Sequence, residues 1–329
     1  MKALLLAALL AAVLAACGGE PGEPVLVTVP RGSGSGAVVD SLAAHDLVNN
    51  PLLFRLYLRL RGADRSLKPG TYRMAPGMSW RAVADKLVSG EVATVQVVVP
   101  EGWSTHRIAP QIAAVTGADP DRVLGFVQDS AAAAQLGVPG PTLEGYLYPA
   151  TYTFPMNADF RDMVGRMVNR YRQVWSAQWR ARADSLGMSE REVVTLASIV
   201  EMEAKVWSER DTIAGVYLNR LEIGMPLQAD PTVQYALGEH QQRLLYRHID
   251  TVADHPYNTY TRRGLPPGPI ASPSQEAMRA VLYPAGTDYL YFVARPDGRH
   301  VFSETLREHN RARARIRAAL REAGAARSQ

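Results

Sequence analysis

The hydrophobic and polar positions along the chain indicate a small mixed unit followed by a mainly helical one. In the first part, short runs of β-branched residues alternate with stretches of helical spacing, in the order strand, helix, helix, strand. Strands are expected at residues 25–29 and 67–72, and helical spacing covers 37–60 and 79–87. The segment Thr94–Val99, β-branched at every position except Gln96, predicts a further strand that links this unit to the rest.

After Pro100, helical spacing and capping residues dominate the pattern. Helices are expected at 104–115, 120–134, 159–186, 189–204, 208–221 and 274–282. Two short strands are expected at 289–294 and 300–302, and the Pro/Gly-rich stretch 264–269 reads as a rigid loop. The pattern therefore predicts an α+β fold, with one domain at 29–99 and a mainly helical domain at 100–329.

The first 17 residues have the features of an export signal. Lys2 is followed by an apolar run to Ala16, which is shorter than the roughly 20 residues that a membrane-spanning helix needs. Leu14-Ala15-Ala16-Cys17 is similar to a bacterial lipobox, in which cleavage precedes a lipid-modified cysteine. We therefore expect residues 1–17 to be a signal with lipidation at Cys17, and 18–28 to be a tether. A plain signal peptide or a short uncleaved anchor are the alternatives.

Composition and charge exclude some classes of protein function. The chain has 329 residues, 36 Lys+Arg against 32 Asp+Glu, and 47% apolar residues, which is typical of a globular protein large enough for two domains. The segment 301–329 holds seven Arg and three Glu, an excess that equals the whole net charge of +4. The main body is therefore balanced, no nucleic-acid partner is expected, and the tail reads as a solvated last helix.

Most catalytic motifs are missing from the sequence. It has no phosphate-binding glycine loop, no G-x-S-x-G and no H-E-x-x-H, and its seven histidines lack ligand spacing. Cys17 is the only cysteine, so a lipidated chain keeps no thiol for nucleophilic or metal chemistry. We expect neither a metal nor a cofactor, which leaves carboxylate chemistry.

Glu201 is the leading candidate carboxyl. Its helix opens with a capping box formed by Ser189 and Glu192, which defines the start. At about 100° per residue, Glu201 lies about 60° from the centre of the apolar stripe, and Glu203 lies about 100° from it. A carboxyl held against apolar neighbours keeps its proton to higher pH, as a general acid must. The alternative is a boundary glutamate that reaches water or pairs with an arginine.

Polar and aromatic residues that follow this helix suit a sugar substrate. The next helix is expected to begin with Ser208 as its cap and to pack against the first one. This arrangement would bring the loop that carries Gln228 and Asp230 to the end of the Glu201 helix. Tyr257-Asn258-Thr259-Tyr260 adds aromatic and amide groups that suit sugar rings and N-acetyl groups. Each of these residues could instead be a turn or capping group.

Several segments of the sequence together resemble the YceG-like family of endolytic murein transglycosylases. Several elements match the family in order along the chain, from about Val25 to Arg313. They are Leu143–Tyr152 (LEGYLYPATY), Ala197–Glu203 (ASIVEME), Ala214–Leu221 (AGVYLNRL), Met225–Tyr235 (MPLQADPTVQY), Tyr257–Tyr260 (YNTY), Gly264–Ala271 (GLPPGPIA), and Tyr289–Ala294 with His300–Phe302 and His309-Asn310. Ala150 and Met202 depart from the family, which usually has Asp and Lys there, so any role of those side chains is absent here.

The resemblance implies cleavage of nascent peptidoglycan strands between N-acetylmuramic acid and N-acetylglucosamine, with 1,6-anhydromuramoyl ends. It implies that Glu201 is the catalytic acid and that residues 29–99 form a LysM-like wall-binding module. Gln228, Asp230, Asn258, Tyr260 and Glu144 are the residues expected to hold the substrate. The expected partners are glycan strands, the membrane through an N-terminal anchor, and peptidoglycan synthases, in the cell envelope.

One acid is enough for this reaction, because the C6 hydroxyl of the muramoyl ring takes the place of water. Two alternatives stay open. The first is a muramidase-type hydrolase that uses Glu201 with Glu203 or Asp230 as a carboxylate pair. The second is a wall-binding protein without catalysis.

Overall fold

The computed structural model describes residues 22–238 and 241–327, and it has an α+β fold, as the sequence predicts. The chain forms two compact units. The first comprises Met1–Val97 together with Tyr152–Asp159, and the second comprises Val98–Thr151 and Phe160–Gln329. The signal segment and Cys17 lie outside the described residues.

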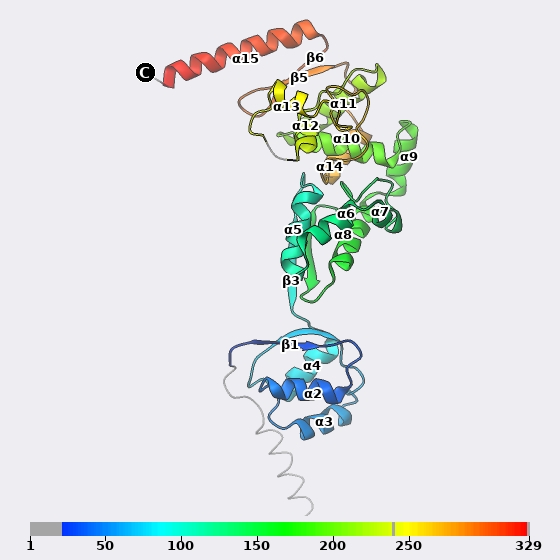
Figure 1. Cartoon of the computed structure of the whole chain (residues 1–329), viewed down its shortest axis with the longest axis vertical. Helices are drawn as coiled ribbons and strands as arrows, with labels where there is room; N and C mark the ends of the chain where they lie inside the picture. The colour runs from blue at the N-terminus through cyan, green and yellow to red at the C-terminus, as the bar shows by residue number, and fades with distance from the viewer. Residues whose placement is uncertain (1–21, 239–240, 328–329) are drawn as a thin grey trace, which may run out of the picture. The chain divides into compact units, whose positions relative to one another are not determined.

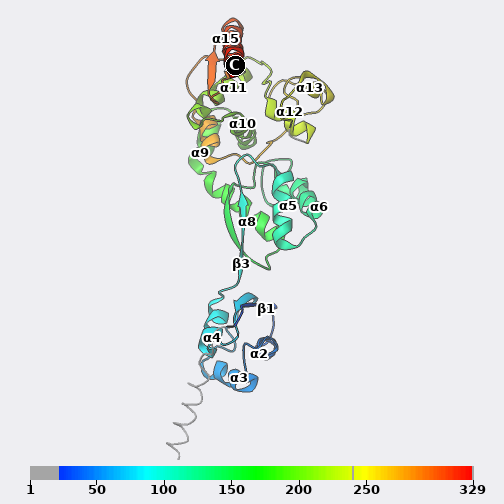
Figure 2. The ribbon, with the colours of Figure 1, turned by 90° about the vertical axis from the view of Figure 1, so that its left-hand side faces the viewer.

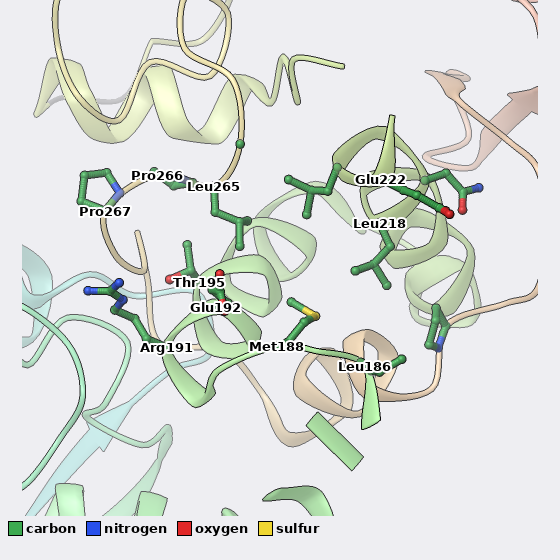
Figure 3. A pocket seen from close by; sticks show the side chains of 14 residues that line it. Leu186, Met188, Arg191, Glu192, Thr195, Leu218, Glu222, Leu265, Pro266 and Pro267 are labelled. Carbon is green, nitrogen blue, oxygen red and sulfur yellow. The ribbon is translucent and has the colours of Figure 1, made fainter. Parts of the chain in front are cut away.

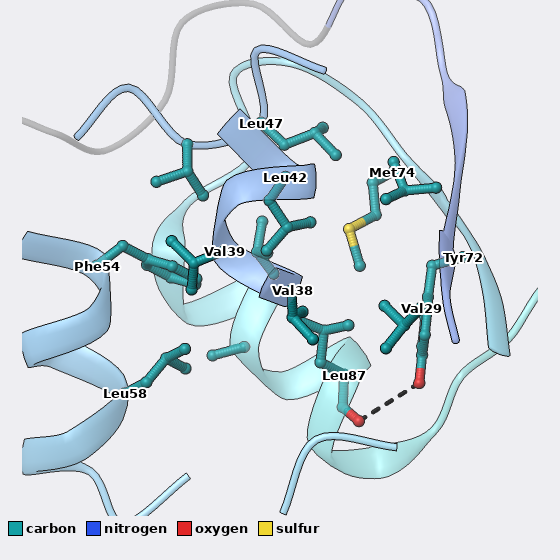
Figure 4. Close-up of a cluster of buried hydrophobic side chains, with 14 of the residues drawn as sticks. Val29, Val38, Val39, Leu42, Leu47, Phe54, Leu58, Tyr72, Met74 and Leu87 are labelled. Carbon is teal, nitrogen blue, oxygen red and sulfur yellow. Dashed lines mark hydrogen bonds between the residues drawn. The ribbon is translucent and has the colours of Figure 1, made fainter. Parts of the chain in front are cut away.

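The first unit is a two-stranded antiparallel sheet with helices against it (Figure 1). Its elements are β1 (Val25–Val29), α2 (Ser35–Ala44), α3 (Pro51–Leu60), β2 (Gly70–Met74) and α4 (Trp80–Ser89). Figure 4 shows the apolar core, in which Leu42 and Phe54 from the helices lie opposite Met74 and Tyr72 from the sheet. The Tyr72 hydroxyl, buried in this core, donates to the backbone carbonyl of Lys68 at 2.6 Å. The order strand, helix, helix, strand is the one that the sequence predicts.

Helical spacing over 37–60 resolves into two helices because of two local signals. Pro51 lacks an N–H group and therefore suits the first turn of a new helix. The Asn50 side chain accepts a hydrogen bond from the N–H of Leu53 and caps that helix.

The second unit is mainly helical, with two short two-stranded sheets (Figures 1 and 2). Strand β3 (Thr94–Val99) pairs with β4 (Ala150–Pro155), and both strands cross the division between the units. The helices are α5 (Thr105–Thr116), α6 (Pro120–Gln128), α7 (Ser130–Gln135), α8 (Phe160–Val174), α9 (Ala177–Ser185), α10 (Glu190–Glu203), η1 (Trp207–Glu209), α11 (Arg210–Glu222), α12 (Asp230–Leu237), α13 (Tyr246–Thr251), α14 (Gln275–Leu282) and α15 (Leu306–Arg327).

Two long expected helices are each divided by a capping side chain. Asp129 accepts from the N–H of Ala131 and starts α7, which splits the expected helix 120–134. Ser176 accepts from the N–H of Trp179 and starts α9, which splits 159–186. Each side chain accepts a hydrogen bond from an N–H group that would bond to a backbone carbonyl in a continuous helix. The capping side chain therefore ends one helix and starts the next.

Helix α10 lies at the centre of this unit. It contacts α14, α11, α12 and α9, and every residue from Val193 to Val200 is buried. Thr195 and Ser198, placed on the polar face by their spacing, are buried as well, and the Ser198 hydroxyl donates to the Thr195 carbonyl. Arg191 and Met202, near the two ends of the same face, are exposed, so only the middle of the helix lacks a solvent face.

The C-terminal part consists of an antiparallel hairpin and a long helix. Strands β5 (Tyr291–Ala294) and β6 (His300–Ser303) pair in register, with Phe292 opposite Phe302. Helix α15 contacts this hairpin, and its later turns extend beyond it (Figure 1, red). The side chains of α15 described as far as Arg321 are mostly exposed, as expected for a solvated helix. Among the described residues, no helix is both long and apolar enough to span a membrane.

Candidate active site

Glu201 lies in the last turn of α10, where its carboxylate meets two other helices at their first turns. Its Oε1 accepts from Nη2 of Arg210, the first residue of α11, at 2.7 Å. Its Oε2 accepts from the backbone N–H of Ser274 at 3.0 Å and from the Ser274 hydroxyl at 2.5 Å. The Glu201 side chain is only 7% exposed. The alternative in which this glutamate pairs with an arginine is thus the one observed, and the expected purely apolar surroundings are not.

Arg210 is itself buried, with 4% of its surface exposed. Its guanidinium carbon lies 4.6 Å from the centre of the Trp207 ring, and Trp207 is 62% exposed. Nη2 bonds Glu201, but Nε and Nη1 are buried without a hydrogen-bond partner among the described residues. Buried donors without a partner are uncommon in folded proteins and mark positions of interest.

The expected cap at Ser208 is not formed. Residues Trp207–Glu209 make a short 3-10 turn instead, and α11 begins at Arg210. The Glu209 carboxylate accepts from the backbone N–H of His300 and lies 2.8 Å from its Nδ1. This long-range contact with β6 holds the turn that carries Trp207, and it could not be inferred from local spacing.

A second carboxyl lies near the first. Glu101 follows β3, and the adjacent Gly102 packs so closely that a Cβ there would lie 3.9 Å from Cγ of Glu201. Gly102 N–H also donates to the Ser272 carbonyl, which aligns the two segments. Burial raises the pKa of Glu101, and the charges of Glu201 and Glu276 raise it further, against the opposing effect of Arg210.

Glu203 has surroundings that helical geometry did not anticipate. Its Oε1 accepts from the Tyr217 hydroxyl at 3.0 Å. Burial raises the pKa of Glu203 to about 7, and the charge of Asp230 adds to this, whereas the Tyr217 hydrogen bond opposes it. Helical spacing places Glu203 farther from the apolar stripe than Glu201, but it does not show that Tyr217 of α11 bonds this carboxyl.

A cleft of about 470 Å³ has Gly102 and Met202, two close neighbours of Glu201, in its lining, whereas Glu201 itself is not part of the lining. It is lined by α5, α10 and α12, and its volume suits a small ligand or part of a polymer. Arg107 and His106 contribute to its wall, and the Arg107 guanidinium lies 4.3 Å from the centre of the Trp103 ring.

The structure brings three of the expected substrate-holding residues to one loop region. Gln228 and Asp230 are exposed, and the Tyr260 hydroxyl donates to Oδ1 of Asp230 at 2.5 Å. Gln228 has φ 50°, an unusual value for a residue with a side chain, and its N–H donates to the Thr259 carbonyl. The charge of Asp230 also acts on Glu203, so this loop lies near the end of α10.

The other two expected residues are buried. Asn258 is 0% exposed; its amide donates to the carbonyls of Ile249 and Val252 and accepts from the N–H of Tyr260. These hydrogen bonds all lie within its own loop, and a direct contact of Asn258 with the sugar stays a prediction.

Glu144 is 2% exposed and accepts from the backbone N–H and the hydroxyl of Thr105, the first residue of α5. Burial raises the pKa of Glu144 to about 7, against these hydrogen bonds. The adjacent Gly145, at φ 82°, leaves no room for a side chain, because a Cβ would lie 2.4 Å from Cβ of Pro269. The LEGY element therefore packs α5 and the Pro-rich loop together, and a substrate contact of Glu144 stays a prediction.

A larger cavity, of about 760 Å³, lies at the other end of α10 and does not include Glu201 (Figure 3). Leu186, Met188, Leu218 and Leu265 point into it, and Arg191 lies at one side. Its lining is mostly apolar and has no group placed near Glu201. Size alone therefore does not locate the chemistry.

Sequence reasoning missed Arg210, Trp207 and Glu101 as neighbours of Glu201. Ser274 was expected only as the start of a helix. A tryptophan just ahead of an S-E-R-D segment was the available signal for Trp207 and Arg210. The effect of the Glu201 charge on Glu101, 100 residues earlier in the chain, had no local signal.

Comparisons with known proteins agree over most of the chain. A family model described as the YceG-like family matches residues 27–315. The endolytic murein transglycosylase of Bacillus subtilis is 35% identical over 308 residues, which cover 88% of this chain and 84% of that protein. A protein of the same name from Streptococcus pneumoniae is 30% identical over 87% of this chain and 57% of its own length. A crystal structure of a YceG-like protein from Listeria monocytogenes is 35% identical with a TM-score of 0.61, and the match covers 88% of this chain and 99% of that one.

Proposed function

Because the chain belongs to the YceG-like family and is a lytic transglycosylase, we propose that it cleaves within nascent peptidoglycan strands, between N-acetylmuramic acid and N-acetylglucosamine. The products carry 1,6-anhydromuramoyl ends. The observation that supports this most is the Glu201 carboxylate, which is held by Arg210 and Ser274 and whose neighbours Gly102 and Met202 line a cleft.

Glu201 acts as acid and then as base in this proposal. It protonates the glycosidic oxygen as positive charge develops on the sugar ring, and the carboxylate then takes the proton of the C6 hydroxyl as that oxygen closes on C1. Glu201 is the acceptor in all three of its hydrogen bonds. They suit a carboxylate that has just given up its proton, and they stabilise the charge that the first step creates.

Gln228, Asp230 and Tyr260 hold the glycan beside this carboxyl, because they are the expected sugar-binding residues that remain accessible or partly so. The first unit is a LysM-like wall-binding module, supported by its strand-helix-helix-strand order. The chain works in the cell envelope during wall assembly, anchored through Cys17 and in the company of peptidoglycan synthases.

Mass analysis of the products tests the proposal. Purified protein is incubated with uncrosslinked glycan strands, and the new ends are identified. Anhydromuramoyl ends are expected. Ends heavier by one water would instead establish a hydrolase that uses a carboxylate pair, and binding without any new ends would establish a wall-binding protein.

A further inference from the structure

We propose that Trp207 and Arg210 form a sugar subsite that takes an uncharged N-acetylhexosamine unit of the glycan next to Glu201. This inference rests on the proposed function and names the part of the substrate that these two side chains recognise. The pyranose face stacks on the exposed indole, and the acetamido carbonyl oxygen accepts from the free N–H groups of Arg210.

The first argument is the state of the Arg210 guanidinium. It is buried and bonded to Glu201 through Nη2, but its Nε and Nη1 have no partner among the described residues. Leaving such donors unpaired in the interior is costly, and an acceptor that reaches them recovers that cost. The pair with Glu201 holds the guanidinium in one orientation, so these donors are ready before the ligand arrives.

The second argument is the exposure of Trp207. An indole that is 62% exposed is unusual at the surface of a folded protein. One face of the Trp207 ring is covered by the Arg210 guanidinium, whose carbon lies 4.6 Å from the ring centre. The other side remains available to solvent. The ring carries negative charge density on its face, which attracts the weakly positive C–H groups of a pyranose.

The position of Trp207 is fixed by tertiary contacts. It belongs to the 3-10 turn whose last residue, Glu209, bonds His300 through both its backbone and its ring. The same turn leads directly into Arg210. The two side chains are therefore presented as a unit, which reduces the entropy lost when a ligand binds.

The surrounding charge selects a neutral ligand over an anionic one. The Glu201 carboxylate is 2.7 Å from Arg210, and the charges of Glu201 and Glu276 both act on nearby Glu101, whose pKa they raise. A carboxylate of a peptide stem would add negative charge to this group and compete with Glu201 for the same guanidinium. An acetamido oxygen makes the hydrogen bond without that repulsion.

Isothermal titration calorimetry on the full chain tests the subsite with two neutral probes. The tetramer of N-acetylglucosamine carries acetamido groups, and cellotetraose has the same pyranose faces without them. We expect the wild type to bind the N-acetylated tetramer more tightly. Trp207→Ala should weaken its binding about tenfold, and Trp207→Phe should stay within about threefold of the wild type. Any binding by the first unit adds the same second site to every variant, so the isotherms are fitted with two sites and only the site that changes between wild type and Trp207→Ala is compared.

Two further variants sharpen the result. Ile223→Ala removes an equally exposed apolar side chain at the far end of α11 and should leave both affinities unchanged. Arg210→Lys, checked for folding by circular dichroism, should abolish the preference for the N-acetylated probe. If that variant does not fold, the affinities of Trp207→Ala and Trp207→Phe relative to the wild type still test the subsite.

Wild-type affinity in Trp207→Ala would overturn the proposal. Equal binding of both probes by the wild type would overturn the role of Arg210 in it. Calorimetry does not require turnover, so a chain that releases no anhydromuramoyl ends would refute the proposed function while leaving this test readable.

Discussion

Ser274 donates both its backbone N–H and its hydroxyl to the same oxygen of Glu201, 73 residues earlier in the chain. The same hydroxyl oxygen accepts from the N–H of Ala277 and caps α14. One serine thus fixes the start of a helix and the orientation of the candidate catalytic carboxyl.

Ser274→Ala should therefore reduce both stability and turnover. Loss of the cap is expected to cost about 1 kcal/mol of unfolding free energy, and loss of the hydrogen bond to Glu201 should lower kcat further. Ser176→Ala is the control, because Ser176 also caps a helix but contacts only the N–H of Trp179. Denaturant unfolding and turnover at equal folded concentration measure the two effects. Equal loss of turnover in both variants would contradict a specific role of Ser274.

Glu201→Gln keeps the size of the side chain but removes the titrating proton. Folding and glycan binding should persist, while the rate of appearance of anhydromuramoyl ends falls about 10²–10⁴-fold, as is typical for loss of a general acid. Glu203→Gln should cost much less, because Glu203 is bonded to Tyr217 inside the protein. The reverse result would move the catalytic role by two positions, and full activity in both variants would remove it from α10.

The buried carboxyl of Glu203 should make stability depend on pH. Burial raises its pKa in the folded state from 4.5 to about 7. Between these values the unfolded chain loses a proton that the folded chain keeps, so this contribution to stability is fully present below pH 4.5 and is lost as pH rises through 7. The rise corresponds to roughly 3 kcal/mol of unfolding free energy as an upper bound.

Glu203→Gln removes that titration. Urea unfolding from pH 5 to pH 8 should show the variant gaining stability relative to the wild type as pH increases. Glu222→Gln, which changes an exposed carboxyl on α11, is the control and should track the wild type. A constant difference between Glu203→Gln and the wild type across this range would show that Glu203 is not the titrating group.

Removal of the first unit should separate wall binding from cleavage. A deletion of residues 22–92 retains β3, the partner of β4, whereas a deletion of 22–99 leaves β4 unpaired. The shorter deletion should reduce sedimentation with insoluble wall material yet still cleave soluble glycan. The longer one should impair folding, as seen by circular dichroism. Undiminished wall binding after the shorter deletion would exclude a wall-binding role for this unit.

Cys17→Ala tests the anchor. The substitution should abolish labelling with a fatty-acid probe and move the protein out of the membrane fraction. Retention in that fraction without any label would identify the apolar segment before Cys17 as the anchor and would refute the lipoprotein hypothesis.

The sequence by itself determined the features that depend on a few neighbouring residues. The capping box at Ser189 was predicted and confirmed, and the helix predicted to start at Ser274 is capped by that residue, because a cap is decided within one helical turn. The order of elements in the first unit and the matches to the family also follow from local pattern.

Only the tertiary structure decided the surroundings of each carboxyl. Spacing within α10 placed Glu203 farther from the apolar side, yet α11 buries it, and the same spacing could not show that Arg210 pairs with Glu201. Asn258 matched a family element but lies enclosed by its own loop. The physical reason is that burial and ion pairing depend on segments brought together from distant parts of the chain, whereas helix periodicity describes a single segment in isolation.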